Sequence, residues 1–510
     1  MSAAPAAAAQ SPEFIPWTPS RVRITIGLMV AIFVAAMDST VVATALPSIA
    51  GELRGFSLYP WVFAAYLLTS TTTVPLWGRL ADIFGRKRVL YAGMAVFVGA
   101  SLLSGASQDM LQLVAFRGLQ GIGAGCLMPV ALTIVGDLFP MAQRARMQGI
   151  FSSVWAFASI VGPLLGATFV STIGWRWIFD VNLPVGLVAV ALLLAYHDHP
   201  QRSGAMHIDY LGAVLLTAGT ALLLWGLGSG NAGGSPSLPV VGAAVAILVA
   251  FGFVERRAVS PTVPVDLLRH RVIGPATAVS SLAGTLMFGV ITYIPLYVER
   301  SLGGSSYEAG YSVAPLIFGW ASAATISGRV LLRVGYRRLA LIGTSVMTLG
   351  TAWILVVPPA AGVAPLIAGS LVIGVGMGMV QTPLLIVVQS SVDWGRRGAA
   401  TALNQFSRTI GGAVGVSLMG VLLEAQLRAQ APARGLDVGR VVAYLNAPPG
   451  TAGAASSGVR SLLGSSLHSV FLVFVGLAAA SIAASVMMAV VTRDREVATR
   501  RPAPAGMPLE

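Results

Sequence analysis

The feature that constrains this chain most is a series of apolar runs, each about 20 residues long, separated by short charged or Gly/Pro-rich segments. An α-helix needs about that length to cross a bilayer, and within it every backbone polar group is bonded internally. Strands of an outer-membrane barrel would instead alternate apolar and polar residues over about ten positions, and this chain lacks that pattern. Only 10% of the residues are charged, against about 25% in soluble domains. The sequence therefore predicts an all-α polytopic membrane protein.

The apolar runs predict fourteen spans, over 24–46, 59–77, 89–106, 110–132, 148–171, 176–196, 209–228, 238–255, 273–297, 310–329, 338–357, 364–388, 399–423 and 467–491. They group into a disordered cytoplasmic leader (1–22), an N-terminal six-helix bundle (23–197), two additional central spans (198–271), a C-terminal six-helix bundle (272–492) and a cytoplasmic tail (493–510). The second bundle contains a long polar outer loop over 425–465. We expect that loop to be either flexible or a partly ordered cap.

The net charge of +13 is explained by topology. Most Lys and Arg residues fall in alternate loops, which the positive-inside rule places in the cytoplasm together with both termini. Binding to nucleic acid is therefore not needed to explain the basicity. Cys126 is the single cysteine and the five His residues lie at the ends of runs, so we expect no metal site. The codon bias implied by the many Ala and Arg residues points to a bacterial plasma membrane.

One basic, glycine-containing sequence occurs twice. GRLADIFGRKRVL begins at Gly78, and GRVLLRVGYRRLA begins at Gly328 with Gly and basic residues at matching positions. A GxGxG pattern also recurs, over 121–125 and 374–378. Internal repeats of this kind are typical of transporters built from two related halves. We therefore expect each copy to be a turn between two spans.

Ionisable residues deep in a bilayer are expensive and indicate function. Asp38 in the first span and Arg117 in the fourth are predicted to lie about 11 Å below the same surface, because a helix rises 1.5 Å per residue. The proton affinity of a buried carboxylate depends on hydration and on nearby positive charge. This pair could therefore bind and release a proton as the protein changes conformation. The alternative is a static ion pair that fixes helix packing.

The remaining polar residues within spans have two interpretations each. Arg408, with Asn404 one turn before it, could face substrate or lipid, or could make a structural hydrogen bond. The glutamines could contact a ligand or link helices. Surfaces lined by Met and aromatic residues can bind varied apolar ligands, although such residues usually belong to the hydrophobic core. The candidate substrate cavity therefore comprises Gln120, Trp155, Phe157, Phe288, Trp320, Gln381, Asn404 and Arg408.

Two further motifs point to movement. The fifth span contains VGPLLGA, in which Gly162, Pro163 and Gly166 would let the helix bend or slide against a neighbour. In the first basic turn, Asp82 is expected near the start of the third span, where a carboxylate favours the positive end of a helix dipole. Its alternative role is that of a simple helix cap.

These motifs resemble those of the major facilitator superfamily. GRLADIFGRKRVL is similar to its signature cytoplasmic motif, RGLQGIGAG to its span-4 motif with Arg117 as the arginine, and VGPLLGA to its span-5 antiporter motif. MDSTVVATALP and WRWIFDVNLP are similar to the fourteen-span drug:proton antiporter branch. The resemblance implies an alternating-access exporter that exchanges protons for hydrophobic or cationic drugs, with proton coupling by Asp38 and Arg117. Gating residues would be Gly78, Asp82, Gly85, Arg86, Lys87, Gly162, Pro163 and Gly166.

The resemblance also indicates which partners to expect and which substrates and activities not to expect. The expected partners are small hydrophobic substrates, protons and lipids, with no cofactor other than the proton gradient and with a monomeric chain. Export of dications is not expected, because Glu299 and Glu424 lie at span ends and no carboxylate lies deep in the second half. The alternative is an exporter of one metabolite or lipid. A membrane enzyme is disfavoured because no catalytic triad, metal site or phosphate loop is present, and an importer because of the span-5 motif.

Overall fold

The computed structural model describes residues 15–139, 141–196, 210–228, 237–257, 265–392, 397–445 and 457–488. These ranges are almost entirely helical and contain no strand. Eleven of the described helices are long and apolar enough to cross a membrane, and two apolar helical stretches, Trp177–Leu193 and Val214–Leu223, are shorter. Most of the leader expected over 1–22 and the whole tail expected over 493–510 lie outside the described residues. The predicted all-α membrane architecture is therefore confirmed.

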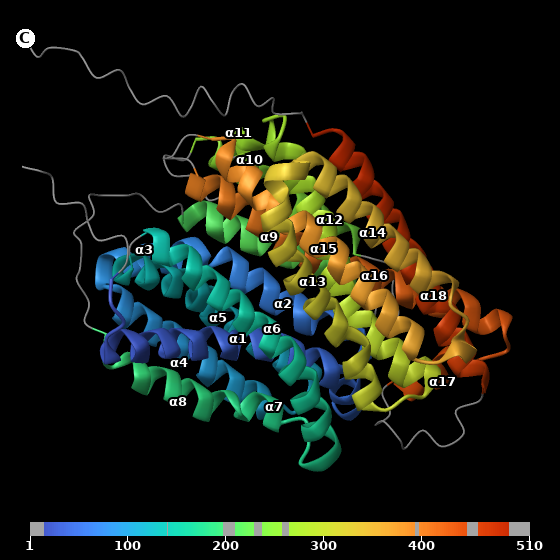
Figure 1. The fold of residues 1–510 in the computed structure, drawn as a ribbon. Helices are drawn as coiled ribbons and strands as arrows, with labels where there is room; N and C mark the ends of the chain where they lie inside the picture. The colour runs from blue at the N-terminus through green and yellow to red at the C-terminus, as the bar shows by residue number, and fades with distance from the viewer. Residues whose placement is uncertain are drawn as a thin grey trace, which may run out of the picture.

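The chain forms two groups of helices that lie side by side, with the N-terminal helices in blue to teal and the C-terminal ones in yellow to red (Figure 1). The first half comprises α1 (Pro19–Glu52), the 3₁₀ turn η1 (Phe56–Leu58), α2 (Tyr59–Thr72), α3 (Val74–Phe84), α4 (Arg86–Gly105), α5 (Met110–Leu138), α6 (Met141–Thr172), α7 (Trp177–Asp180) and α8 (Asn182–Leu193).

The central segment comprises α9 (Tyr210–Gly228), α10 (Leu238–Glu255) and α11 (Val265–Leu268). In it α9 packs against α2 and α16, one helix of each half, while α10 packs on α9. The second half comprises α12 (Ile273–Leu296), the π-helical turn η3 (Tyr297–Leu302), α13 (Ser306–Val334), α14 (Tyr336–Val356), the 3₁₀ turn η4 (Pro359–Ala361), α15 (Ala364–Ser390), α16 (Arg397–Ala433), α17 (Val438–Leu445) and α18 (Ser457–Val486).

Every predicted span coincides with helix, but two of them are broken. The range 59–77 divides at Thr73 into α2 and α3, and the range 176–196 divides into α7 and α8 at Val181. A proline follows each break within three residues, Pro75 in α3 and Pro184 in α8. Because proline has no backbone N–H, the hydrogen bond to the fourth residue before it cannot form, which weakens the helix there.

The segment 425–465, expected to be either flexible or a partly ordered cap, is largely helical in its described part. α16 continues to Ala433, and α18 begins at Ser457. Between them α17 places the buried side chains of Val441, Tyr444 and Leu445 against the core. The segment is polar on average, yet the apolar residues of α17 lie on one face of the helix. That face packs against the core.

The repeated basic sequence forms the same turn twice. Gly85 joins α3 to α4 with φ 90° and ψ 148°, and Gly335 joins α13 to α14 with φ 83° and ψ 149°. Glycine adopts this positive φ without strain. Gly78, which we expected in the first turn, lies inside α3, and Gly328 lies inside α13. The expected two-half repeat is therefore visible in the backbone itself.

Matching basic residues after each turn bind the end of each half's last helix. The Lys87 ammonium donates to the carbonyl oxygens of Leu194 (2.9 Å) and Tyr196 (2.6 Å) beyond α8. The Arg337 guanidinium donates to the Val486 carbonyl of α18 (2.7 Å). Cations at these positions satisfy free carbonyls and complement the negative end of the helix dipole. We call the end of the bundle that carries these turns the basic end.

The repeated glycines pack the same neighbours in each half. A side chain at Gly121 would overlap α2, and one at Gly123 would overlap α4. Correspondingly, a side chain at Gly374 would overlap α13, and one at Gly376 would overlap α14. Small residues let helix backbones approach closely in a membrane. α5 and α15 are therefore the central helices of their halves.

Candidate functional site

A buried ion pair lies inside the N-terminal half. Asp38 of α1 and Arg117 of α5 are both fully buried, and Arg117 Nη1 lies 2.6 Å from Asp38 Oδ2. The structure thus brings together the two residues whose depths matched in the sequence. Their helices run in opposite directions and pack against each other, which places the two side chains at one level.

Three uncharged side chains complete a hydrogen-bond network around the carboxylate. Gln120 Nε2 donates to Asp38 Oδ1 (2.8 Å), and its Oε1 accepts from Arg117 Nη1 (2.7 Å). Asn182 Nδ2 lies 3.2 Å from Asp38 Oδ1 and 2.8 Å from the Ser101 hydroxyl. Side chains of four helices, α1, α4, α5 and α8, therefore join one hydrogen-bond network. Gln120, expected in a substrate cavity, is placed in this network.

Arg117 is also enclosed by aromatic rings. Its guanidinium lies 4.2 Å from the Tyr66 ring centroid and 6.0 Å from that of Phe179. Nη2 has no hydrogen-bond partner among the described residues. A buried cation depends on such partners because it has lost its water. The site therefore holds one charge of each sign, and packed side chains shield both from bulk solvent.

The span-5 motif lies one helical turn from the ion pair. On α6, Gly162 and Gly166 contact α1 at Thr40 and Val41, and the Thr40 hydroxyl donates to the Ala158 carbonyl (3.2 Å). α6 continues as helix through Pro163, whose ring contacts Gly310 of α13 in the other half. α6 thus connects the helix that carries Asp38 with the second half of the protein.

The basic turn makes an ion pair of its own. Arg86, the first residue of α4, contacts Asp137 near the end of α5 (3.1 Å). The Trp77 indole donates to the Ile122 carbonyl (2.7 Å), which joins α3 to α5. Asp82, which we expected near the start of the third span, lies near the C-terminal end of α3.

The other candidate cavity residues lie on five helices, α6, α12, α13, α15 and α16. Asn404 donates to Ser280 (2.8 Å), Arg408 stacks on Trp320, and Gln381 is buried on α15. Phe288 lies against Gly412, and Trp155 packs against the core. Phe157 is 60% exposed beside Phe33. No group of His, Cys, Asp and Glu that could hold a metal ion occurs among the residues that the structure describes.

Ser101 and Asn182 were missed by the sequence analysis. Each is a single uncharged polar residue in an apolar run, and charge was the signal that identified Asp38 and Arg117. The signal available for Asn182 was an amide residue within an apolar run, since an amide in lipid needs a partner. Asn182 also lies in WRWIFDVNLP, whose resemblance to a transporter motif could have drawn attention to it.

Replacing Asn182 by Leu is expected to destabilise the protein and to shift the pH at which transport is half-maximal. The carboxylate loses one donor and Ser101 loses a partner, which costs about 1–3 kcal/mol in free energy of unfolding. Asn404→Leu is the matched control, because it breaks a similar amide–hydroxyl bond in the other half. Thermal melting and a pH profile of transport should show loss of stability in both variants but a changed profile for Asn182→Leu alone. An unchanged profile in both would remove Asn182 from the site.

Comparison with known proteins identifies the family. The model of the Major Facilitator Superfamily matches residues 28–416, so the chain belongs to this superfamily. It is therefore a multi-pass membrane transporter, not an enzyme.

Two of the similar proteins come from Bacillus subtilis. "Multidrug transporter protein MdtP" of Bacillus subtilis is 34% identical over 449 residues, which is 87% of this chain and 82% of the relative. "Multidrug resistance protein 3" of the same organism is 31% identical over 406 residues, or 78% and 79% of the two chains. Among solved structures, a bacterial homologue of the human lysosomal transporter Spinster matches with a TM-score of 0.67 at 16% identity, covering 96% of this chain and all of that one. That likeness confirms the fold.

Proposed function

We propose that the protein is a proton-coupled antiporter with fourteen spans that exports hydrophobic compounds from a bacterial cell by alternating access. The observation that carries the proposal is the buried Asp38–Arg117 pair with its hydrogen-bond network. A carboxylate in this position can bind a proton only when a conformational change lets water or solute reach it. The printed names of the two Bacillus relatives support efflux of drugs as the role.

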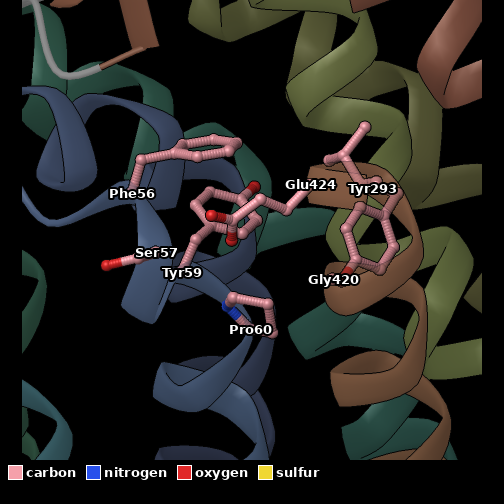
Figure 2. A pocket seen from close by; sticks show the side chains of 8 residues that line it. Phe56, Ser57, Tyr59, Pro60, Tyr293, Gly420 and Glu424 are labelled. Carbon is pink, nitrogen blue, oxygen red and sulfur yellow. The ribbon is translucent and has the colours of Figure 1, made fainter. Parts of the chain in front are cut away.

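Alternating access is supported by the contacts between the two halves. Hydrogen bonds that join them in the described residues lie at the end opposite the basic end. Arg300 Nη2 donates to the Pro47 carbonyl (2.9 Å), and the Tyr59 hydroxyl donates to the Thr292 carbonyl (3.0 Å). Figure 2 shows the same region, where Tyr59 and Pro60 of α2 face Tyr293 of α12 and Gly420 of α16 around a small pocket.

With the basic end in the cytoplasm, as the positive-inside rule places it, the protein would be closed on its outer side. Opening toward the outside then requires these contacts between the halves to break. The halves would rock about the packed α6–α13 contact. This motion would change the surroundings of Asp38, because α1 carries both Asp38 and Pro47.

Replacing Arg300 by Ala is expected to favour opening at the outer side. Its buried guanidinium joins Pro47 of α1 and the Tyr444 carbonyl of α17, and loss of a charged hydrogen bond costs about 1.5–3 kcal/mol, or ten- to hundredfold in the closed–open ratio. The measurement is labelling by an impermeant maleimide of a cysteine placed at Ser48 in a Cys126→Ser background. Tyr444→Phe is the control, because it removes the bond to the Arg300 carbonyl and keeps the bond to Pro47. Equal labelling with and without Arg300 would contradict the gate.

The proposed function itself is tested by transport in proteoliposomes with an imposed pH gradient. Ethidium and a neutral lipophilic dye serve as substrates, and empty liposomes and a protonophore serve as controls. Dye movement that requires both protein and gradient supports antiport of drugs. Movement that ignores the gradient would contradict proton coupling, and failure of both dyes would favour an exporter of one metabolite or lipid.

A further inference from the structure

Arg408 is a cation inside the second half that has no counter-ion in the described part of the chain. It lies on α16, about 16 Å along the helix from Arg397 at 1.5 Å per residue. Its Nε is enclosed and has no hydrogen-bond partner, and no described carboxylate forms an ion pair with its guanidinium. The residue as a whole is half-buried, so part of the side chain still borders open space.

This arrangement contrasts with that of Arg117. Arg117 is compensated by Asp38 and Gln120, whereas the contact that Arg408 makes among the described residues is with one aromatic ring. A charge in a membrane protein interior that lacks a partner is costly and indicates a functional site. Packing does not require the charge either, because α16 contacts α12 through the Arg408 backbone at Gly284. The guanidinium is therefore free to bind a solute.

The surroundings of Arg408 define the chemistry of that solute. The guanidinium lies 5.5 Å from the centroid of the Trp320 ring on α13, a stack that holds the side chain in place and supplies an apolar surface. On α15, Gly378 contacts the Trp320 backbone, and Gln381 one turn later is buried with its Nε2 unpartnered. The Arg408 guanidinium and the Gln381 amide N–H are hydrogen-bond donors that lack an acceptor. A ligand with a negatively charged acceptor group would supply it.

We propose that Arg408 and Trp320 form a binding subsite for an organic anion, meaning a carboxylate, sulfonate or phosphate group carried on an aromatic or apolar body. This inference rests on the proposed exporter function and specifies its substrate class, which differs from the cationic drugs that the family resemblance implies. Arg is suited to this role because its planar fork donates two parallel hydrogen bonds to such groups. The aromatic body of the ligand would lie against Trp320.

Two sources could supply this anionic group: a transported solute or the head group of an anionic phospholipid. Both have the acceptor chemistry that the site lacks. They differ in that a lipid would occupy the subsite permanently in a membrane of suitable composition. Competition between the two distinguishes them.

The test compares two dyes that share a body and differ in charge, 8-anilinonaphthalene-1-sulfonate and the neutral N-phenyl-1-naphthylamine. Binding to the full-length protein in phosphatidylcholine nanodiscs is measured by equilibrium dialysis, with binding to empty nanodiscs subtracted. Arg408→Gln is expected to weaken binding of the sulfonate about tenfold or more and to leave binding of the neutral dye within twofold. Arg408→Lys, which keeps the charge but loses the fork, should give an intermediate loss.

Three outcomes would overturn the subsite: equal affinity of wild type and Arg408→Gln for the sulfonate, an equal loss for both dyes, or no binding of either dye to the wild type. Unchanged thermal melting of Arg408→Gln is the folding control, and Arg408→Lys takes its place should it fail to fold. Displacement of the sulfonate by added phosphatidylglycerol identifies a lipid head group as the ligand, and no displacement identifies a solute. Because binding needs no gradient, loss of gradient-driven transport would refute antiport and leave this result standing.

Discussion

Replacing Asp38 by Asn is expected to abolish transport driven by a pH gradient while substrate binding is retained. Asn has nearly the same size and keeps an oxygen that accepts from Gln120, but it can neither bind nor release a proton. Arg117 then stays buried without its carboxylate, and removing one partner of a buried pair costs about 3–5 kcal/mol in free energy of unfolding. The measurements are dye uptake into proteoliposomes and dye binding to the purified variant.

Glu52→Gln is the matched control for this change. Glu52 lies on the same helix and also pairs with an arginine, Arg176, but both side chains of that pair are exposed. Exposed pairs contribute about 0–1 kcal/mol, so stability and transport should stay near wild type. Persistent gradient-driven transport by Asp38→Asn would remove Asp38 from the proton path. Loss of both binding and transport would instead indicate a structural role.

Replacing Gly162 by Ala is expected to reduce transport more than tenfold and to lower stability. The new Cβ would overlap the Thr40 hydroxyl and lie 2.8 Å from its Cβ, so α6 and α1 must separate next to the ion pair. Overpacking of this kind costs about 1–3 kcal/mol in free energy of unfolding. Thermal melting and gradient-driven transport measure the two effects.

A size exchange and a neutral glycine provide the controls. Thr40→Gly removes the overlapping atoms, so the double variant Gly162→Ala/Thr40→Gly should recover much of the lost stability and transport. Gly99→Ala on α4 has open space at the new Cβ and should be neutral or slightly stabilising, because Ala is the better helix former. Wild-type transport by Gly162→Ala alone, or no recovery in the double variant, would show that α6 does not need this close contact with α1.

The sequence predicts the fold well because the bilayer imposes a single length and a single secondary structure on each apolar run. Each of the fourteen expected ranges is helical over most of its described part, and the repeat of turns at Gly85 and Gly335 is visible in the sequence. Helix ends were less predictable. The helices α1 and α16 extend beyond their apolar runs. Polar residues in the last turns of a helix are solvated by water, so an apolar run marks only the part of the helix that lies within the membrane.

The breaks at Thr73 and Val181 had a local signal in the following prolines, but a proline within a span is often tolerated without a break. Pro163 is such a case, because α6 continues through it. Sequence alone does not separate these outcomes, since neighbouring helices decide whether the freed carbonyl finds a partner. The helix α17 likewise depends on contacts with distant residues, because the Tyr444 hydroxyl donates to the Arg300 carbonyl.

The candidate site was predictable to the extent that charge and depth define it. Asp38 and Arg117 are charged, and their equal depths follow from helix geometry. Asn182 joins them because packing turns it toward Asp38, and Ser101 joins them through its hydrogen bonds with Asn182 and Gln120. Packing also decides which way the expected cavity residues face. Gln120 turns toward Arg117, and Gln381 is buried in the other half.

The proposed antiport requires that substrate and proton alternate on a carrier whose proton site is Asp38. The decisive measurement is the number of protons released when a transported dye is added to purified protein in weakly buffered solution. The wild type is predicted to release protons on binding, and Asp38→Asn, which still binds the dye, is predicted to release none. Equal release from both proteins would place the coupling elsewhere, and no release from either would contradict exchange of substrate for protons.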